Sequence, residues 1–188
     1  MISIIGQHKR NLSVVPYRSV WVALFESEAD LLRAALGENA LCIEHCGSTS
    51  IPGMAAKPII DIMVAVVSLT QAVELIPAVE SLGYIYRPDD TIPERIFFAK
   101  ESAPEVRTHH LNLVQQDSKF WTNQLAFRDY LRTHAQVAVA YVDLKMSLAE
   151  KATQTGEIDR EGKAAFVARV LALANDEERG SEGGNYLG

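Results

Sequence analysis

The chain has 188 residues, of which 48% are hydrophobic and 22% are charged, and its formal net charge is −6. This acidic balance argues against a protein that grips a long nucleic acid over a broad basic face. No run approaches the roughly 20 apolar residues of a membrane span, and no signal peptide is evident, so we expect a cytoplasmic protein that does not contact a membrane.

The length suits one hydrophobic core of ordinary size. We therefore predict a single domain over residues 1–175, followed by an acidic, glycine-rich tail over residues 176–188 that stays flexible. Cys42 and Cys46 are interpreted as free thiols of a reducing compartment.

The first part of the chain alternates helical and strand patterns. A helical stripe over residues 19–36 ends at Gly37, which is typical of a helix C-cap. A short apolar run over residues 40–45 predicts a strand that leads into a turn at Gly47. Residues 59–67 are almost all apolar and often β-branched, which predicts a central strand covered on both faces.

The next elements predict a mixed sheet with further helices. Apolar residues at helical spacing over residues 69–82 predict a helix that Pro77 kinks or shortens. Stretches separated by Pro and Asp turns predict three strands, at residues 84–87, 95–100 and 107–114. The C-terminal third predicts three helices, at residues 119–134, 138–152 and 158–174. The predicted fold class is α/β (α+β), a mixed β-sheet core with flanking and C-terminal helices.

A small, hydroxyl-rich turn predicts a phosphate site. It comprises Gly47, Ser48, Thr49 and Ser50, and Asp61 follows on the predicted central strand. Backbone amides and small hydroxyl groups can surround a phosphate, whereas a carboxylate in an apolar strand costs desolvation free energy unless something binds it. We therefore expect a nucleotide or another phosphorylated small molecule as ligand. Asp61 would bind a divalent metal or a substrate hydroxyl, or else accept hydrogen bonds from the amides of the turn.

Residues 107–114 hold a second polar cluster. Because side chains alternate along a strand, His110 and Asn112 point to one face and His109 to the other, so the two histidines cannot both ligate one ion. Beside the Asp61 strand, His110 and Asn112 could act as metal ligand, proton carrier or phosphate donor. Each histidine is equally compatible with a buried side chain satisfied by a carbonyl group.

Basic side chains near these motifs are further candidates. His45 precedes the turn and would either help to hold an anion or fix the turn through a hydrogen bond. Lys57, Arg95, Lys100 and Arg128 are candidates for phosphate contact. Lys57 and Arg95 flank the expected site and are preferred.

Over about residues 12–174 the chain resembles the GrpB family. The motifs that carry the resemblance are Pro16-Tyr17, Glu44-His45, Gly47-Ser48-Thr49-Ser50 with Pro52-Gly53, Lys57-Pro58-Ile59-Ile60-Asp61, Thr108-His109-His110-Leu111 and Phe127-Arg128-Asp129-Tyr130-Leu131. That family is similar to the nucleotidyltransferase superfamily of the polymerase β type, and it occurs fused to dephospho-CoA kinase in some bacteria. The resemblance implies a nucleotidyltransferase-like core in which a Gly-Ser turn grips a nucleotide triphosphate and carboxylates hold Mg²⁺ or Mn²⁺.

Carried over residue by residue, the resemblance is incomplete. Gly47 and Ser48 match the Gly-Ser of the superfamily, and Asp61 matches its first metal-binding carboxylate. Met63 stands at the second carboxylate, and the third position falls to His110 or Asn112.

The resemblance thus makes Asp61 and His110 the expected catalytic residues, although one Asp with soft or neutral neighbours is a poor magnesium cage. Two functions follow: a metal-dependent nucleotidyltransferase acting on a small molecule, and a catalytically inactive module that binds a metabolite or a protein partner. The sequence leaves open whether the protein forms a homodimer.

Overall fold

The computed structural model describes residues 5–8, 14–155 and 160–183. The chain divides into two compact units, Met1–Thr122 and Asn123–Gly188. The division falls inside the single domain predicted over residues 1–175.

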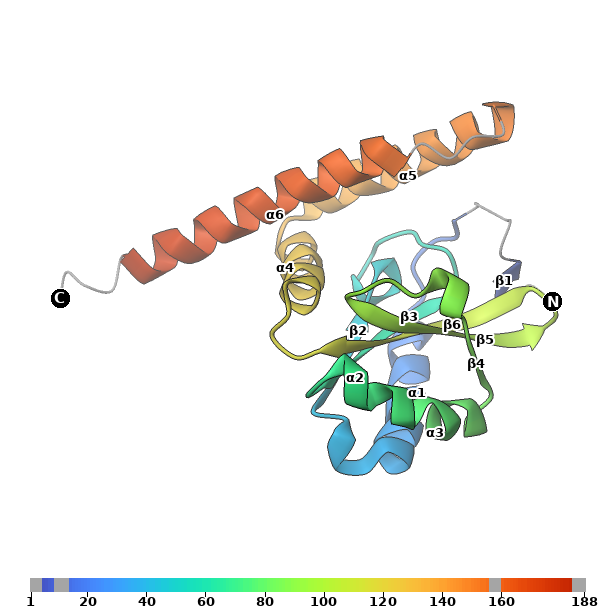
Figure 1. Cartoon of the computed structure of the whole chain (residues 1–188). Coiled ribbons are helices and arrows are strands. Elements are labelled where there is room, and N and C mark those ends of the chain that lie inside the picture. The colour runs from blue at the N-terminus through green and yellow to red at the C-terminus, as the bar shows by residue number, and fades with distance from the viewer. Residues whose placement is uncertain (1–4, 9–13, 156–159, 184–188) are drawn as a thin grey trace. The chain divides into compact units, whose positions relative to one another are not determined.

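The first unit is built on a mixed β-sheet (Figure 1). The strands are β1 (Gln7–His8), β2 (Cys42–Cys46), β3 (Ile60–Val66), β4 (Tyr84–Tyr86), β5 (Arg95–Ala103) and β6 (Val106–Gln115). The order in the described part of the sheet is β2-β3-β6-β5-β4, and β1 pairs with the beginning of β6. β3 and β6 are parallel, whereas the other pairs are antiparallel. The mixed sheet that the sequence predicted is confirmed, with β3 and β6 at its centre.

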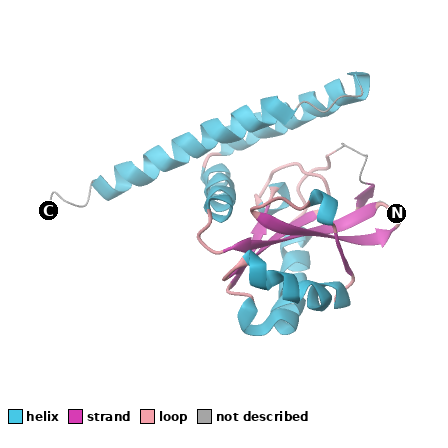
Figure 2. Ribbon diagram, in the orientation of Figure 1, coloured by secondary structure: helices cyan, strands magenta, loops and turns pink. Residues whose placement is uncertain are grey.

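Helices cover one face of this sheet (Figure 2). They are α1 (Val20–Leu36), α2 (Leu69–Ala72) and α3 (Ile76–Ser81). Fully buried side chains of α1, Trp21 among them, share one core with Ile62 of β3 and Leu111 of β6. A single 3-10 turn separates α2 from α3, and Pro77 lies in the first turn of α3, where the missing N–H costs no helical hydrogen bond. The helix predicted over residues 69–82 is therefore divided.

The second unit is helical. Its elements are the remainder of α4 (Lys119–Thr133), α5 (Ala135–Thr155) and α6 (Arg160–Gly183). The rings of Tyr141 in α5 and Phe166 in α6 stack with centroids 5.3 Å apart. α6 extends to Gly183, so the tail predicted to be flexible over residues 176–188 is helical that far, and residues 184–188 lie outside the described residues. No described helix is long and apolar enough to cross a membrane.

Candidate functional site

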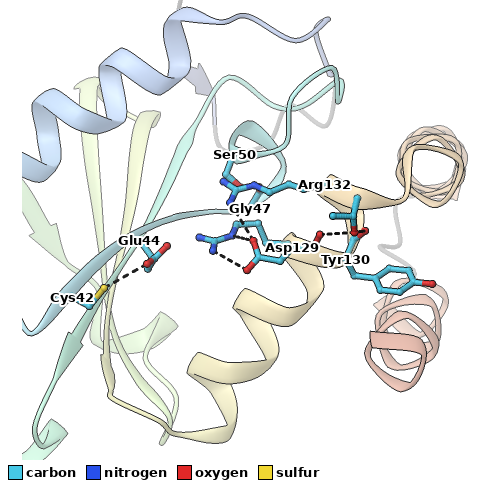
Figure 3. Close-up of polar contacts among 9 residues, drawn as sticks. Cys42, Glu44, Gly47, Ser50, Asp129, Tyr130 and Arg132 are labelled. Atoms are coloured by element: carbon cyan, nitrogen blue, oxygen red, sulfur yellow. Dashed lines mark hydrogen bonds and ion pairs between the residues drawn. The ribbon is translucent and has the colours of Figure 1, made fainter. Parts of the chain in front are cut away.

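The turn after β2 is braced by its own hydroxyl groups. Ser48–Ser50 form a single 3-10 turn that follows Gly47. Ser50 Oγ donates to the Gly47 carbonyl at 2.6 Å (Figure 3), and Thr49 Oγ1 donates to the Ile59 carbonyl at 3.3 Å. Both side chains are buried. Their hydroxyl groups therefore hold the turn, and the phosphate roles of Thr49 and Ser50 stay predictions.

His45 supports the same turn from the helix-covered side of the sheet. It pairs in register with Ile62, a core residue. Its ring stacks on Phe25 of α1 with centroids 4.7 Å apart, and its Nε2 lies 3.0 Å from Thr49 Oγ1. Of the two roles considered for His45, these contacts correspond to fixing the turn, because the ring lies on the face opposite Asp61.

Gly47 and Asp61 are in direct contact. The register of β2 and β3 places Cys46, the residue before the turn, opposite Asp61. A Cβ atom on Gly47 would overlap with Oδ2 and Cγ of the Asp61 carboxylate. The φ angle of Gly47 is +66°, a region that L side chains rarely adopt. Only glycine fits here, and the turn and the carboxylate that the sequence placed in one site do meet.

His110 and Asn112 lie on the same face as Asp61, as predicted. In the parallel pairing of β3 with β6, Asp61 is opposite His110 and Met63 is opposite Asn112. His110 Nδ1 and Asp61 Oδ1 are 2.9 Å apart, and since a carboxylate only accepts, Nδ1 is the donor. Asn112 Nδ2 donates to the Ile62 carbonyl at 3.3 Å. The sheet therefore brings together the side chains whose proximity depended on strand order.

Arg95 completes this group. Its NH1 donates to Asn112 Oδ1 at 2.8 Å, and its guanidinium carbon lies 4.5 Å from the centroid of the Phe97 ring. Burial lowers the pKa of Arg95, whereas the charges of Asp90 and Asp61 act in the opposite direction. The negative charge of Asp61 therefore stabilises the positive charge of Arg95. We call Gly47, Asp61, Arg95, His110 and Asn112 the Asp61 cluster.

Other predicted cations have different surroundings. Lys100 faces the helix-covered core, where its Nζ lies 2.8 Å from Glu28 Oε1. Arg128, in the second unit, pairs with the adjacent Asp129 at 2.8 Å. Lys57 is half-buried between the turn and β3. The phosphate roles of Lys57 and of the half-buried Ser48 stay predictions.

Arg107 is a neighbour of the cluster that sequence reasoning missed. The pairing of β5 with β6 shifts register so that Lys100 is opposite His109 but Glu101 is opposite Arg107, which leaves Thr108 unmatched. The guanidinium carbon of Arg107 lies 6.0 Å from the centroid of the Phe97 ring, on which Arg95 also rests. A β-bulge of this kind redirects side chains, and strict alternation along the sequence contains no signal for it.

His109, unlike His110, is a core side chain. Its ring lies against Tyr84, and its Nδ1 is 3.0 Å from Thr108 Oγ1. Burial lowers the pKa of His109 to about 4, although the nearby charge of Glu28 opposes this shift. His109 is therefore neutral at physiological pH. Its contact with Tyr84 confirms the prediction that His109 and His110 point to opposite faces of the sheet.

We expect the buried His109 to lower the free energy of unfolding in mild acid. Its pKa of about 4 in the folded protein lies below the ordinary 6.5, so the unfolded chain binds more protons in this interval and stability falls as the pH falls below 6.5. This single group would lower the free energy of unfolding by about 2 kcal/mol between pH 7 and pH 5. Urea unfolding of wild type and His109→Gln at several pH values measures it. Equal pH dependence in the two proteins would contradict the assignment.

The donor groups on this face do not match a two-metal site. Mg²⁺ and Mn²⁺ prefer several oxygen ligands, but Met63, where the resemblance expects a carboxylate, is an apolar side chain only 1% exposed. Glu44 is opposite Met63, yet its Oε1 already accepts from Cys42 Sγ at 3.5 Å (Figure 3). Among the described residues no three His, Cys, Asp or Glu side chains gather where they could hold a metal ion. The residues therefore do not fit the ions implied by the resemblance.

Comparison with known proteins places the chain among bacterial relatives. The sequence profile of the family described as GrpB protein matches residues 11–173. "Glutamate-rich protein GrpB" of Alkalihalophilus pseudofirmus is 34% identical over 170 residues, which cover 89% of this chain and 98% of that protein. "UPF0157 protein YqkA" of Bacillus subtilis is 32% identical over 94% of this chain and 51% of that protein, so this chain spans about half of its length.

A solved structure is similar over most of the fold. It is the crystal structure of the conserved protein GrpB from Enterococcus faecalis, with 37% sequence identity and a TM-score of 0.77. The match covers 88% of this chain and 99% of that chain.

Proposed function

Because this chain belongs to the GrpB family, we propose that it binds a nucleotide or another phosphorylated small molecule at the Asp61 cluster. The contact between Gly47 and the Asp61 carboxylate carries the proposal. It places the small, hydroxyl-rich Gly-Ser turn, whose backbone can approach a phosphate closely, against an acceptor on the central strand. A phosphate ester needs both kinds of group, since its phosphate accepts hydrogen bonds and its sugar hydroxyls donate them.

The cluster assigns a separate role to each charge. Arg95 supplies a planar cation suited to phosphate oxygens. Asp61 is held by His110 through Oδ1, and its Oδ2 lies against Gly47. A carboxylate repels phosphate, so we assign Asp61 to a donor group of the ligand, such as a hydroxyl, rather than to the phosphate itself.

We further propose that the protein acts as a binding module and does not transfer nucleotides by a two-metal mechanism. Such transfer needs oxygen ligands around both ions. The buried Met63 and the engagement of Asp61 with His110 leave the cluster short of them. This observation favours the non-catalytic alternative over the nucleotidyltransferase that the family resemblance implies.

Thermal unfolding with the four nucleoside triphosphates, CoA precursors and pyrophosphate tests the binding proposal. A ligand at 100 times its Kd is expected to raise the free energy of unfolding by about 2.7 kcal/mol. We expect Asp61→Ala to weaken nucleotide binding about 10-fold or more, because a hydrogen bond to a charged group contributes about 1.5–3 kcal/mol. Calorimetric titration provides the affinity. Asp30→Ala removes an exposed carboxylate on α1 and serves as the matched control.

Two outcomes would contradict these proposals. If none of these ligands stabilises the protein, with or without Mg²⁺ or Mn²⁺, the site does not bind phosphorylated molecules. If the protein releases pyrophosphate from a nucleoside triphosphate in a metal-dependent reaction that Asp61→Asn abolishes, the module is an enzyme.

A further inference from the structure

We propose that Arg95 and Arg107 form a subsite for a diphosphate or longer phosphoanhydride, and that they supply the positive charge there without a divalent metal ion. The inference rests on the proposed function and specifies the class of its ligand. Arg107 begins the second polar cluster of the sequence, but no role was predicted for it there. It reaches this face through the register shift between β5 and β6.

The two guanidinium groups converge on one aromatic ring. The guanidinium carbons of Arg95 and Arg107 lie 4.5 Å and 6.0 Å from the centroid of the Phe97 ring. The centroids of the Phe97 and His110 rings are 5.3 Å apart, in an edge-to-face arrangement. The ring attracts each cation, but two like charges near one ring repel each other. An anion that bridges the two groups would relieve this repulsion.

Arg95 and Arg107 have N–H donors that remain available to a ligand. Arg95 donates from NH1 to the neutral Asn112. Arg107 NH2 lies 3.5 Å from Asp90 Oδ2, a long ion pair whose carboxylate side chain is 52% exposed. The Nε of Arg107 is buried and has no hydrogen-bond partner among the described residues. Although the Arg107 side chain is only 18% exposed, the Asp90 carboxylate is half-exposed and its ion pair is long, so a phosphate oxygen can displace it.

The charge balance explains why no metal ion is needed. In a carboxylate-rich site, a metal ion separates the acidic ligands from the phosphates. Here the cluster has a single carboxylate, Asp61, which His110 already engages. Once a phosphate oxygen has displaced Asp90 from Arg107, the two arginines exceed Asp61 in charge, so a diphosphate meets net positive charge. Arginine also matches phosphate oxygens in pairs, as a planar fork.

Calorimetric titration of pyrophosphate and ATP, each in EDTA and in Mg²⁺, tests this subsite. We expect the affinity in EDTA to stay within about threefold of that in Mg²⁺. Arg95→Gln and Arg107→Gln should each weaken pyrophosphate binding at least tenfold. Arg33→Gln removes an exposed arginine of α1 and should leave it unchanged.

Asp90→Asn supplies a variant with the opposite expectation. It removes the carboxylate that competes for Arg107, so pyrophosphate should bind at least threefold more tightly. A gain in affinity cannot arise from misfolding, which keeps the subsite testable if an arginine variant fails to fold.

The outcomes separate this inference from the proposed function. Binding that requires Mg²⁺, or binding unaffected by the arginine variants and by Asp90→Asn, would overturn the subsite and leave the proposed function standing. Absence of binding by pyrophosphate and ATP under both conditions would overturn the subsite, and it overturns the proposed function as well if the other nucleotides and CoA precursors also fail.

Discussion

Gly47→Ala is expected to lower the free energy of unfolding by about 3–4 kcal/mol and to abolish phosphate binding. With φ +66° and ψ −175°, Gly47 occupies a region that is essentially confined to glycine, and an alanine there costs about 1–3 kcal/mol. The new Cβ would also overlap with the Asp61 carboxylate and push it from His110 Nδ1, at the cost of a charged hydrogen bond of about 1.5–3 kcal/mol. Urea unfolding and titration with pyrophosphate measure the two effects.

Gly53→Ala is the matched control for this substitution. Gly53 has a φ of +78°, but a Cβ there would meet nothing within 4 Å. Gly53→Ala should therefore lose only the free energy of the backbone strain, about 1–2 kcal/mol, and should retain phosphate binding. Equal losses of stability in the two variants would show that the contact between Gly47 and Asp61 contributes nothing.

Glu28→Ala is expected to lower the free energy of unfolding by about 3–5 kcal/mol, because it leaves a buried lysine charge without its partner. Glu28 on α1 and Lys100 on β5 pair at 2.8 Å, with only 9% and 24% of their side chains exposed. Lys100 Nζ also lies 5.2 Å from the centroid of the Tyr84 ring. Burial raises the pKa of Tyr84 far above its ordinary value, and the charge of Glu28 adds to the shift, so this hydroxyl cannot replace the lost carboxylate.

Asp30→Ala on the same helix is the control for the buried pair. Asp30 and Arg33 lie 2.6 Å apart, but their side chains are 76% and 51% exposed, so the expected loss is below about 1 kcal/mol. Replacing both buried partners, Glu28→Met with Lys100→Met, should recover most of the stability, because well-packed apolar side chains replace buried ion pairs at little cost. Urea unfolding midpoints compare the variants. A loss for Glu28→Ala no larger than that for Asp30→Ala would contradict the prediction.

The sequence by itself determined most of the elements and, away from the register shift at Arg107, the directions of side chains along the strands. Alternation along residues 107–114 placed His110 and Asn112 on one face and His109 on the other, and the structure confirms this. The pattern is readable because alternation is a local property of an extended chain. The small residues of the turn and the lone Asp61 in an apolar strand were visible for the same reason.

Only the tertiary structure decided which of these side chains act together. The pairing of β3 with β6 brought Asp61 to His110, and the register shift in β6 turned Arg107 toward Phe97. Lys100 donates a hydrogen bond to Glu28, 72 residues away in the sequence, on the helix-covered side of the sheet. The hydroxyl groups of Thr49 and Ser50 donate to main-chain carbonyls and so brace the turn. A polar group's role depends on the partner it meets, and when that partner is distant in sequence, only the packing of the folded chain selects it.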